Sequence, residues 1–180
     1  MTEDRELERQ RLAYHRAGYG LALYTQGRQI PVLSLTEQAE PPVPDEGHTP
    51  RGWEVAMGSR ARHEVELEIL ARWTALVSES RGCLDDREPP AGWGPAAEAL
   101  SVLGGRVTRD PEENKAYLEW MRRRALGLIG IPEIWAAVQA VARALLEGGT
   151  LSSRETSGII AGVLRAKRGR AGIAGFFNPR

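Results

Sequence analysis

Two stretches rich in proline and glycine divide the chain, and they constrain its fold more than any other feature. They are residues 39–52 (AEPPVPDEGHTPRG) and 81–95 (RGCLDDREPPAGWGP). Proline lacks a backbone donor and glycine disfavours regular structure, so both stretches are predicted to be loops. Helices and strands are therefore expected before, between and after them.

Helix signals occupy most of the remaining chain. Between the two stretches, residues 60–80 carry apolar side chains at helical spacing. Asp110 and the Pro-Glu-Glu that follows it form a helix start, with an N-cap acid and a first-turn proline. Ser152-Ser153-Arg154-Glu155 has the pattern of a capping box. The other predicted helices are 3–26, 95–103, 111–129, one from Pro132 to about Gly148, and one from Ser153 to about Ala166.

Strand character is limited to one region. Residues 29–36 (QIPVLSLT) have strand composition, and residues 53–57 (WEVAM) are a predicted second strand that pairs with them. The alternation required for a large sheet is missing. The fold class expected is mainly α, with a small β-hairpin or sheet at about residues 30–57. Residues 1–168 are predicted to form a single domain and 169–180 a basic, glycine-rich tail.

Composition limits the partners and the compartment. Lys plus Arg equals Asp plus Glu at 24 each, so the basic excess of a typical nucleic-acid binder is missing. Cys83 is the one cysteine, which rules out an internal disulfide and favours a reducing compartment. We expect a cytoplasmic protein with no membrane or nucleic-acid partner. The sequence has no phosphate-binding G-x-x-x-x-G-K-[ST] loop, so no nucleotide is expected.

The segment with the most informative candidate functional residues lies in the first predicted helix, at residues 15–19 (HRAGY). His15 and Tyr19 are four residues apart and share a helix face. The same spacing places two histidines on one zinc ion in H-E-x-x-H peptidases, where the glutamate after the first histidine activates water.

The surrounding residues strengthen this comparison. Residues 11–35 (RLAYHRAGYGLALYTQGRQIPVLSL) resemble the segment around the HEAGH motif in the FtsH family of zinc metallopeptidases. His15, Ala17 and Gly18 match the motif. A looser resemblance extends over residues 8–165, and it places Asp110 near the family's third, acidic zinc ligand. It implies a helical peptidase-like domain whose zinc site would use His15 and Asp110.

Two motif positions depart from the family. Arg16 stands where the family has its general-base glutamate, and guanidinium stays protonated at working pH. Tyr19 stands at the second histidine, and a phenol that titrates near 10 is a poor zinc ligand. His15 and Asp110 alone are fewer than the three protein ligands of a catalytic site. No confident catalytic residue, and no cofactor, is therefore expected; zinc would bind only in a rewired site.

Each of these residues also has a plain structural role. His15 is expected to be an ordinary helix histidine and Asp110 a helix cap. Tyr19 is expected to fill the emptied metal cavity. Arg16 is expected to be a solvated surface charge or, alternatively, to replace the zinc charge and pair with an acid, for which the candidates are Asp110, Glu64 and Glu68. Cys83 beside acidic residues is not expected to be a nucleophile.

Three functions follow from this reasoning. The first is a catalytically inactive relative of the FtsH-type peptidase domain that binds or regulates a protein or peptide partner. The second is a metal-dependent hydrolase, or a zinc metallopeptidase of the ATP-dependent type, with a rewired site. The third is a helical protein-interaction module unrelated to proteolysis.

Overall fold

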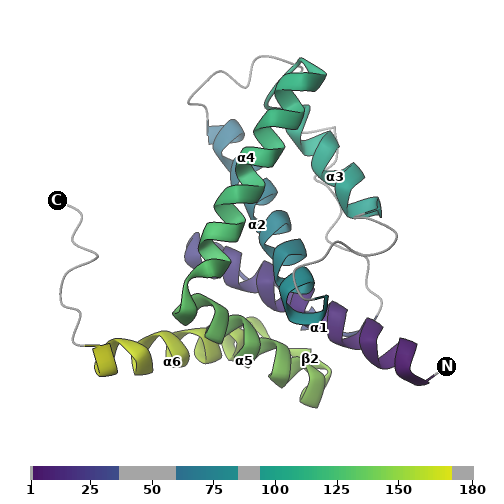
Figure 1. Ribbon diagram of the computed structural model, residues 1–180. Coiled ribbons are helices and arrows are strands. Elements are labelled where there is room, and N and C mark those ends of the chain that lie inside the picture. Colours follow the sequence, from purple (N-terminus) through teal and green to yellow (C-terminus); the bar gives the residue numbers. More distant parts are fainter. Residues whose placement is uncertain (1, 37–59, 85–93, 172–180) are drawn as a thin grey trace.

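The structure is a computed structural model that describes residues 2–36, 60–84 and 94–171. This part of the chain forms six helices and one two-stranded sheet (Figure 1). The helices are α1 (Thr2–Thr25), α2 (Arg60–Cys83), α3 (Gly94–Gly104), α4 (Pro111–Gly130), α5 (Pro132–Gly148) and α6 (Ser153–Ala171). The strands are β1 (Leu33–Ser34) and β2 (Thr150–Leu151). The predicted fold class, mainly helical with a small sheet, is confirmed.

The small sheet joins distant parts of the chain. β1 and β2 pair antiparallel, with Leu33 opposite Leu151 and Ser34 opposite Thr150. Both leucines are buried. The partner of β1 thus comes from the turn between α5 and α6, while the partner predicted at residues 53–57 lies outside the described residues. The pairing fixes the segment after α1 against the C-terminal helices.

Helices α1 and α2 form the centre of the fold as an antiparallel pair. Near one end a Cβ on Gly82 would meet the ring of Tyr14, and near the other Gln26 donates to the carbonyl of Leu67. The helices come closest at Gly18, where a Cβ would lie 2.8 Å from the carbonyl oxygen of Thr74 and closer still to Ser78. Only glycine allows this approach, so the glycine of the HRAGY segment is needed for packing.

The remaining helices cover this pair. α5 packs on α1 and α4 packs on α2, and the two outer helices meet at an angle of 85° (Figure 1). Ile131 has extended backbone at the corner, as expected before Pro132. Arg81 of α2 donates to the carbonyl of Ile129 and lies over the ring of Trp135, 4.5 Å from its centroid. The Arg81 side chain therefore contacts both α4 and α5 where the two helices meet.

The predicted helix boundaries hold where local caps define them. Asp110 caps α4, and its carboxylate accepts from the backbone N–H of Glu112 and Glu113. Ser152 and Glu155 make the reciprocal bonds of a capping box ahead of α6.

Two helices run further than the sequence predicts. α2 continues to Cys83, inside the stretch predicted to be a loop, because Gly82 packs under an aromatic ring instead of ending the helix. α6 continues to Ala171, into the predicted tail. Residues 172–180 lie outside the described part.

None of the helices in residues 2–36, 60–84 and 94–171 is by itself long and apolar enough to cross a membrane. α4 and α5 reach the length and apolar character of a span only when taken together, across their 85° bend.

Candidate functional site

The face of α1 that carries His15 and Tyr19 lies against α2, as its spacing predicts. Tyr19 donates to Glu68 of α2, and His15 contacts Glu79 of the same helix. Each of these carboxylates also holds arginine side chains, so the interface contains two separate charged clusters. We call them the Glu68 cluster and the Glu79 cluster.

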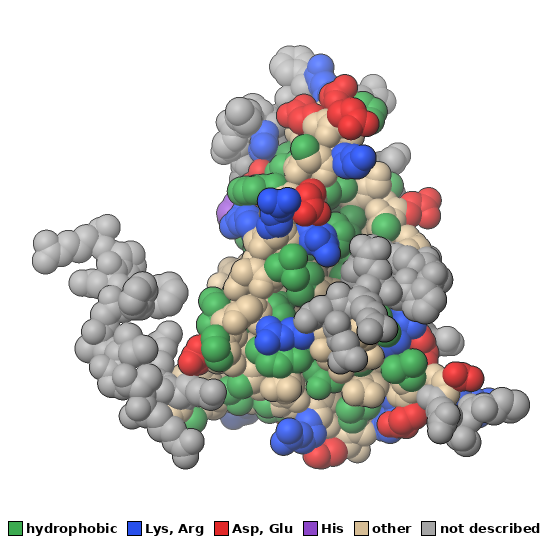
Figure 2. Space-filling view, viewed as in Figure 1, with side chains coloured by type: hydrophobic (Ala, Val, Ile, Leu, Met, Phe, Trp, Pro, Cys, Tyr) green, Lys and Arg blue, Asp and Glu red, His purple; other side chains and the backbone are tan. Residues whose placement is uncertain are grey.

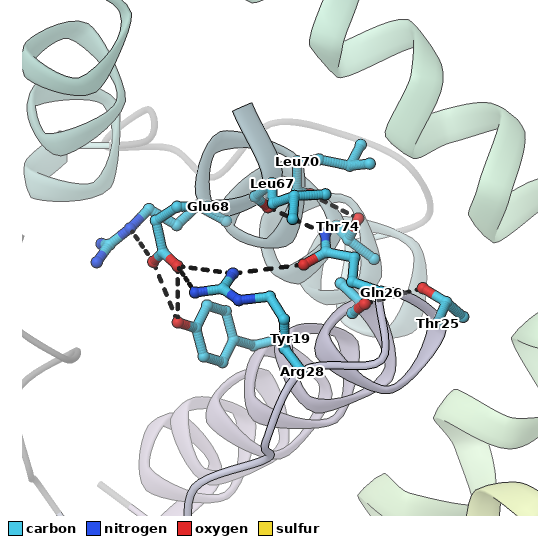
Figure 3. A network of polar contacts seen from close by, with 10 residues as sticks. Tyr19, Thr25, Gln26, Arg28, Leu67, Glu68, Leu70 and Thr74 are labelled. Atoms are coloured by element: carbon cyan, nitrogen blue, oxygen red, sulfur yellow. Dashed lines mark hydrogen bonds and ion pairs between the residues drawn. The ribbon is translucent and has the colours of Figure 1, made fainter. Parts of the chain in front are cut away.

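The Glu68 cluster consists of Glu68, Tyr19, Arg28 and Arg72 (Figure 3). The Tyr19 hydroxyl lies 3.1 Å from Oε1 of Glu68, and Nε of Arg72 lies 2.9 Å from the same oxygen. Arg28, from the turn after α1, donates to Oε2 at 3.2 Å. Glu68 and Arg72 are 7% and 4% exposed, so this is a buried ion pair. Several donors satisfy the carboxylate, which is the condition for such a pair to be tolerated.

Tyr19 is a neutral hydrogen-bond donor in this cluster. Burial of the phenol, followed by the nearby charge of Glu68, raises the pKa of Tyr19 to about 12. A phenol with that pKa is protonated at neutral pH. Tyr19 thus carries a hydroxyl that links α1 to α2.

The Glu79 cluster consists of Glu79, His15, Arg11 and Glu8. Nδ1 of His15 lies 3.0 Å from Oε2 of Glu79, and Nε of Arg11 lies 2.9 Å from Oε1. Arg11 also pairs with Glu8. Burial alone would raise the pKa of Glu79, but hydrogen bonds and charges from His15 and Arg11 outweigh burial and hold that pKa below its usual value. Glu79 is therefore a charged acceptor for His15 and Arg11.

The residues predicted as partners of Arg16 have other roles in the structure. Asp110 caps α4, Glu64 is exposed on α2, and Glu68 is engaged by Tyr19, Arg28 and Arg72. Arg16 itself is half-buried on α1. Its role as the replacement for the zinc charge stays a prediction.

Sequence reasoning missed most members of both clusters. The residues that were not among the predicted site residues are Glu8, Arg11, Arg28, Arg72 and Glu79. A signal was present in α2, where residues 68, 72 and 79 carry charge at spacings of four and seven. Such spacing places charges on one helix face, and here that face is buried. Charges on an otherwise apolar face indicate partners on the neighbouring helix.

Neither His63 nor Cys83 forms a metal-binding group with His15. His63 is exposed at the start of α2, sixteen residues before Glu79, which corresponds to ~24 Å along a helix. Burial, followed by the charge of Glu79, raises the pKa of Cys83 to about 11, so its thiol is protonated at neutral pH. His48 lies outside the described residues. Among the residues described, no three His, Cys, Asp or Glu side chains are grouped to hold a metal ion.

No protein-family model, no curated protein and no solved structure matches this chain. The function proposed below is therefore based on the geometry of the α1–α2 interface.

Proposed function

We propose that this protein is a non-catalytic relative of the FtsH-type peptidase domain that acts as a binding or regulatory module. The observation that supports the proposal most is the bond from Tyr19 to the buried Glu68. The residue at the second zinc-ligand position of the motif joins two helices, and its acceptor is already shared with two arginines.

Metallopeptidase chemistry depends on a metal-bound water and a nearby base. General-base assistance alone contributes about 10²–10⁴-fold to rate. Arg16 occupies the position of that base in the motif, and a guanidinium accepts no proton. Tyr19 is protonated at neutral pH because its pKa lies at about 12. At two of the three motif positions the chain therefore carries a residue unsuited to the motif's chemistry, and one of them, Tyr19, donates to Glu68 instead.

One observation favours the rewired metal site instead. His15 contacts Glu79 through Nδ1, and a carboxylate in that position often orients the imidazole of a metal-binding histidine. Three protein ligands are still the minimum for a catalytic zinc site. We therefore retain this alternative as the outcome that the test below is designed to detect.

The test is cleavage of casein by the purified full chain, with and without a chelator. We expect no cleavage above that of the buffer. Cleavage that a chelator blocks, and that His15→Ala abolishes, would show the rewired hydrolase and overturn the proposal. Asn114→Ala, which alters a residue of α4 outside both clusters, is the matched control.

A second experiment separates a peptidase relative from an unrelated helical module. The double variant Arg16→Glu/Tyr19→His restores the residues of the family motif, so zinc binding by this variant requires the ancestral geometry. Arg16→Glu/Tyr19→Phe has the same charge change without the imidazole and serves as the control. We expect zinc binding in the first variant and none in the second. If the first remains folded by circular dichroism and binds no zinc, the relationship to the peptidase fails.

A further inference from the structure

The outward face of α4 carries exposed apolar residues in a row. Ala116, Trp120 and Gly127 are exposed, and their spacings of four and seven place them along one side of the helix. Ile131, the exposed residue with extended backbone that directly follows α4, lies at the end of the row. Trp120 is 51% exposed and Ile131 is 45% exposed. We call this row the α4 seam. Apolar residues at these spacings are the pattern by which one helix packs on another.

A glycine inside the seam supports the same interpretation. Gly127 lies within α4, where glycine is less favourable than alanine. A Cβ at this position would meet nothing within 4 Å, so no contact within the protein requires glycine there. The missing side chain leaves a low point between Trp120 and Ile131, at which the backbone of a second helix can approach closely.

The charges beside the seam define its partner. Arg122, Arg123 and Arg124 follow one another on α4, and Glu119 is the acid that pairs with the first two of them. Three arginines against one glutamate leave two positive charges over residues 119–124. Figure 2 shows basic side chains interleaved with hydrophobic ones over α4. Arg124 lies 4.9 Å from the ring centroid of Trp120, so one of these charges lies directly at the seam.

We propose that the α4 seam binds an acidic amphipathic helix of a partner protein. The apolar face of that helix would cover Trp120, Gly127 and Ile131, and its carboxylates would neutralise Arg123 and Arg124. The proposal names the partner class for the binding role proposed above and rests on that role.

A second copy of this chain fits the seam less well. In a dimer with a two-fold axis through the seam, the middle of the seam in one copy would contact the middle of the seam in the other. Arg123 and Arg124 lie near that middle, so the arginines of the two copies would face each other within about one helical turn. Like charges in that arrangement oppose association, whereas the carboxylates of an acidic helix relieve the repulsion.

The test uses two synthetic helices of about three heptads, both with leucine at the a and d positions. One has glutamate at the flanking e and g positions and the other has lysine there. Each is labelled with fluorescein and titrated with the full chain while its anisotropy is measured. We expect the acidic helix to bind at least about tenfold more tightly, and its affinity to fall as salt is raised.

Two variants locate the binding surface. Trp120→Ala should weaken binding of the acidic helix about tenfold, since buried tryptophans dominate helix interfaces. Arg123→Glu/Arg124→Glu should reverse the preference in favour of the lysine helix. Val32→Ala is the control, because Val32 is exposed but lies outside α4. All three altered positions of α4 are exposed, so the variants are expected to remain folded.

Three results would overturn the proposal. They are equal binding of both helices, binding that Trp120→Ala leaves unchanged, and a dimer in sedimentation equilibrium that Trp120→Ala abolishes. The last result would assign the seam to a second copy. None of them bears on zinc or casein cleavage, so failure here is distinguishable from failure of the proposed non-catalytic role.

Discussion

The hydroxyl of Tyr19 donates to Oε1 of Glu68 across 3.1 Å and thereby connects the motif helix to a buried carboxylate of α2. Tyr19→Phe removes this bond and keeps the ring. We expect a loss of about 1.5–3 kcal/mol in the free energy of unfolding, the range for a hydrogen bond to a charged group. The measurement is urea denaturation. Tyr24→Phe, which deletes a hydroxyl from a half-buried tyrosine of the same helix, should change stability by less than about 0.5 kcal/mol.

Glu68→Ala tests the whole Glu68 cluster. The change leaves Arg72, which is 4% exposed, without its carboxylate. Removing one partner of a buried ion pair costs about 3–5 kcal/mol, which exceeds the effect of Tyr19→Phe. Glu64→Ala removes an exposed carboxylate from the same helix and should be nearly neutral. Equal effects of the two alanine variants on urea denaturation would show that the Glu68 cluster does not hold α1 against α2.

The Glu79 cluster predicts how stability depends on pH. Despite its burial, His15 and Arg11 hold the pKa of Glu79 below the ordinary value of 4.5. A lowered pKa in the folded state adds stability above the unfolded pKa, and this is lost as the pH falls through the folded value.

The wild-type protein should therefore exceed Glu79→Gln in stability at neutral pH, with the difference shrinking below about pH 4.5. Urea denaturation of both proteins over a range of pH measures this difference. A difference that grows on acidification would contradict the assigned direction of the shift.

Gly18 and Gly127 provide opposite tests of helical glycine. A Cβ at Gly18 would crowd Ser78 and lie 2.8 Å from the Thr74 carbonyl, so Gly18→Ala should cost about 1–3 kcal/mol. Gly127 has open space around it, so Gly127→Ala should stabilise the free protein by about 0.5–1 kcal/mol. Thermal denaturation of both variants decides the matter. Stabilisation by both would show that α1 and α2 are not in close contact at residue 18.

Local signals in the sequence predict most of the fold. Asp110 and the Ser152–Glu155 box mark helix starts through bonds within three residues, so they are readable without the tertiary structure. The pairing of β1 with β2 is not readable in this way, because the two strands are separated by most of the described chain.

In the candidate site, too, local features could be predicted from the sequence and contacts between distant residues could not. The spacing of His15 and Tyr19 correctly predicts a shared face toward the second helix. The acceptors Glu68 and Glu79 could not be predicted in this way. Which residues of α2 face His15 and Tyr19 depends on how the two helices align in space, and spacing within one helix does not specify that alignment. Glu68 appeared among the sequence candidates only as a partner for Arg16, whereas Tyr19, Arg28 and Arg72 are its partners in the structure.

The proposal to be tested is that Tyr19 and Arg16 occupy the place of a lost zinc centre. Its most direct test is the zinc content of the full chain, purified after expression in zinc-supplemented medium and measured by plasma mass spectrometry. The account predicts well under one zinc per chain, with the same value for His15→Ala. About one zinc per chain in the wild-type protein, lost in His15→Ala, would contradict it.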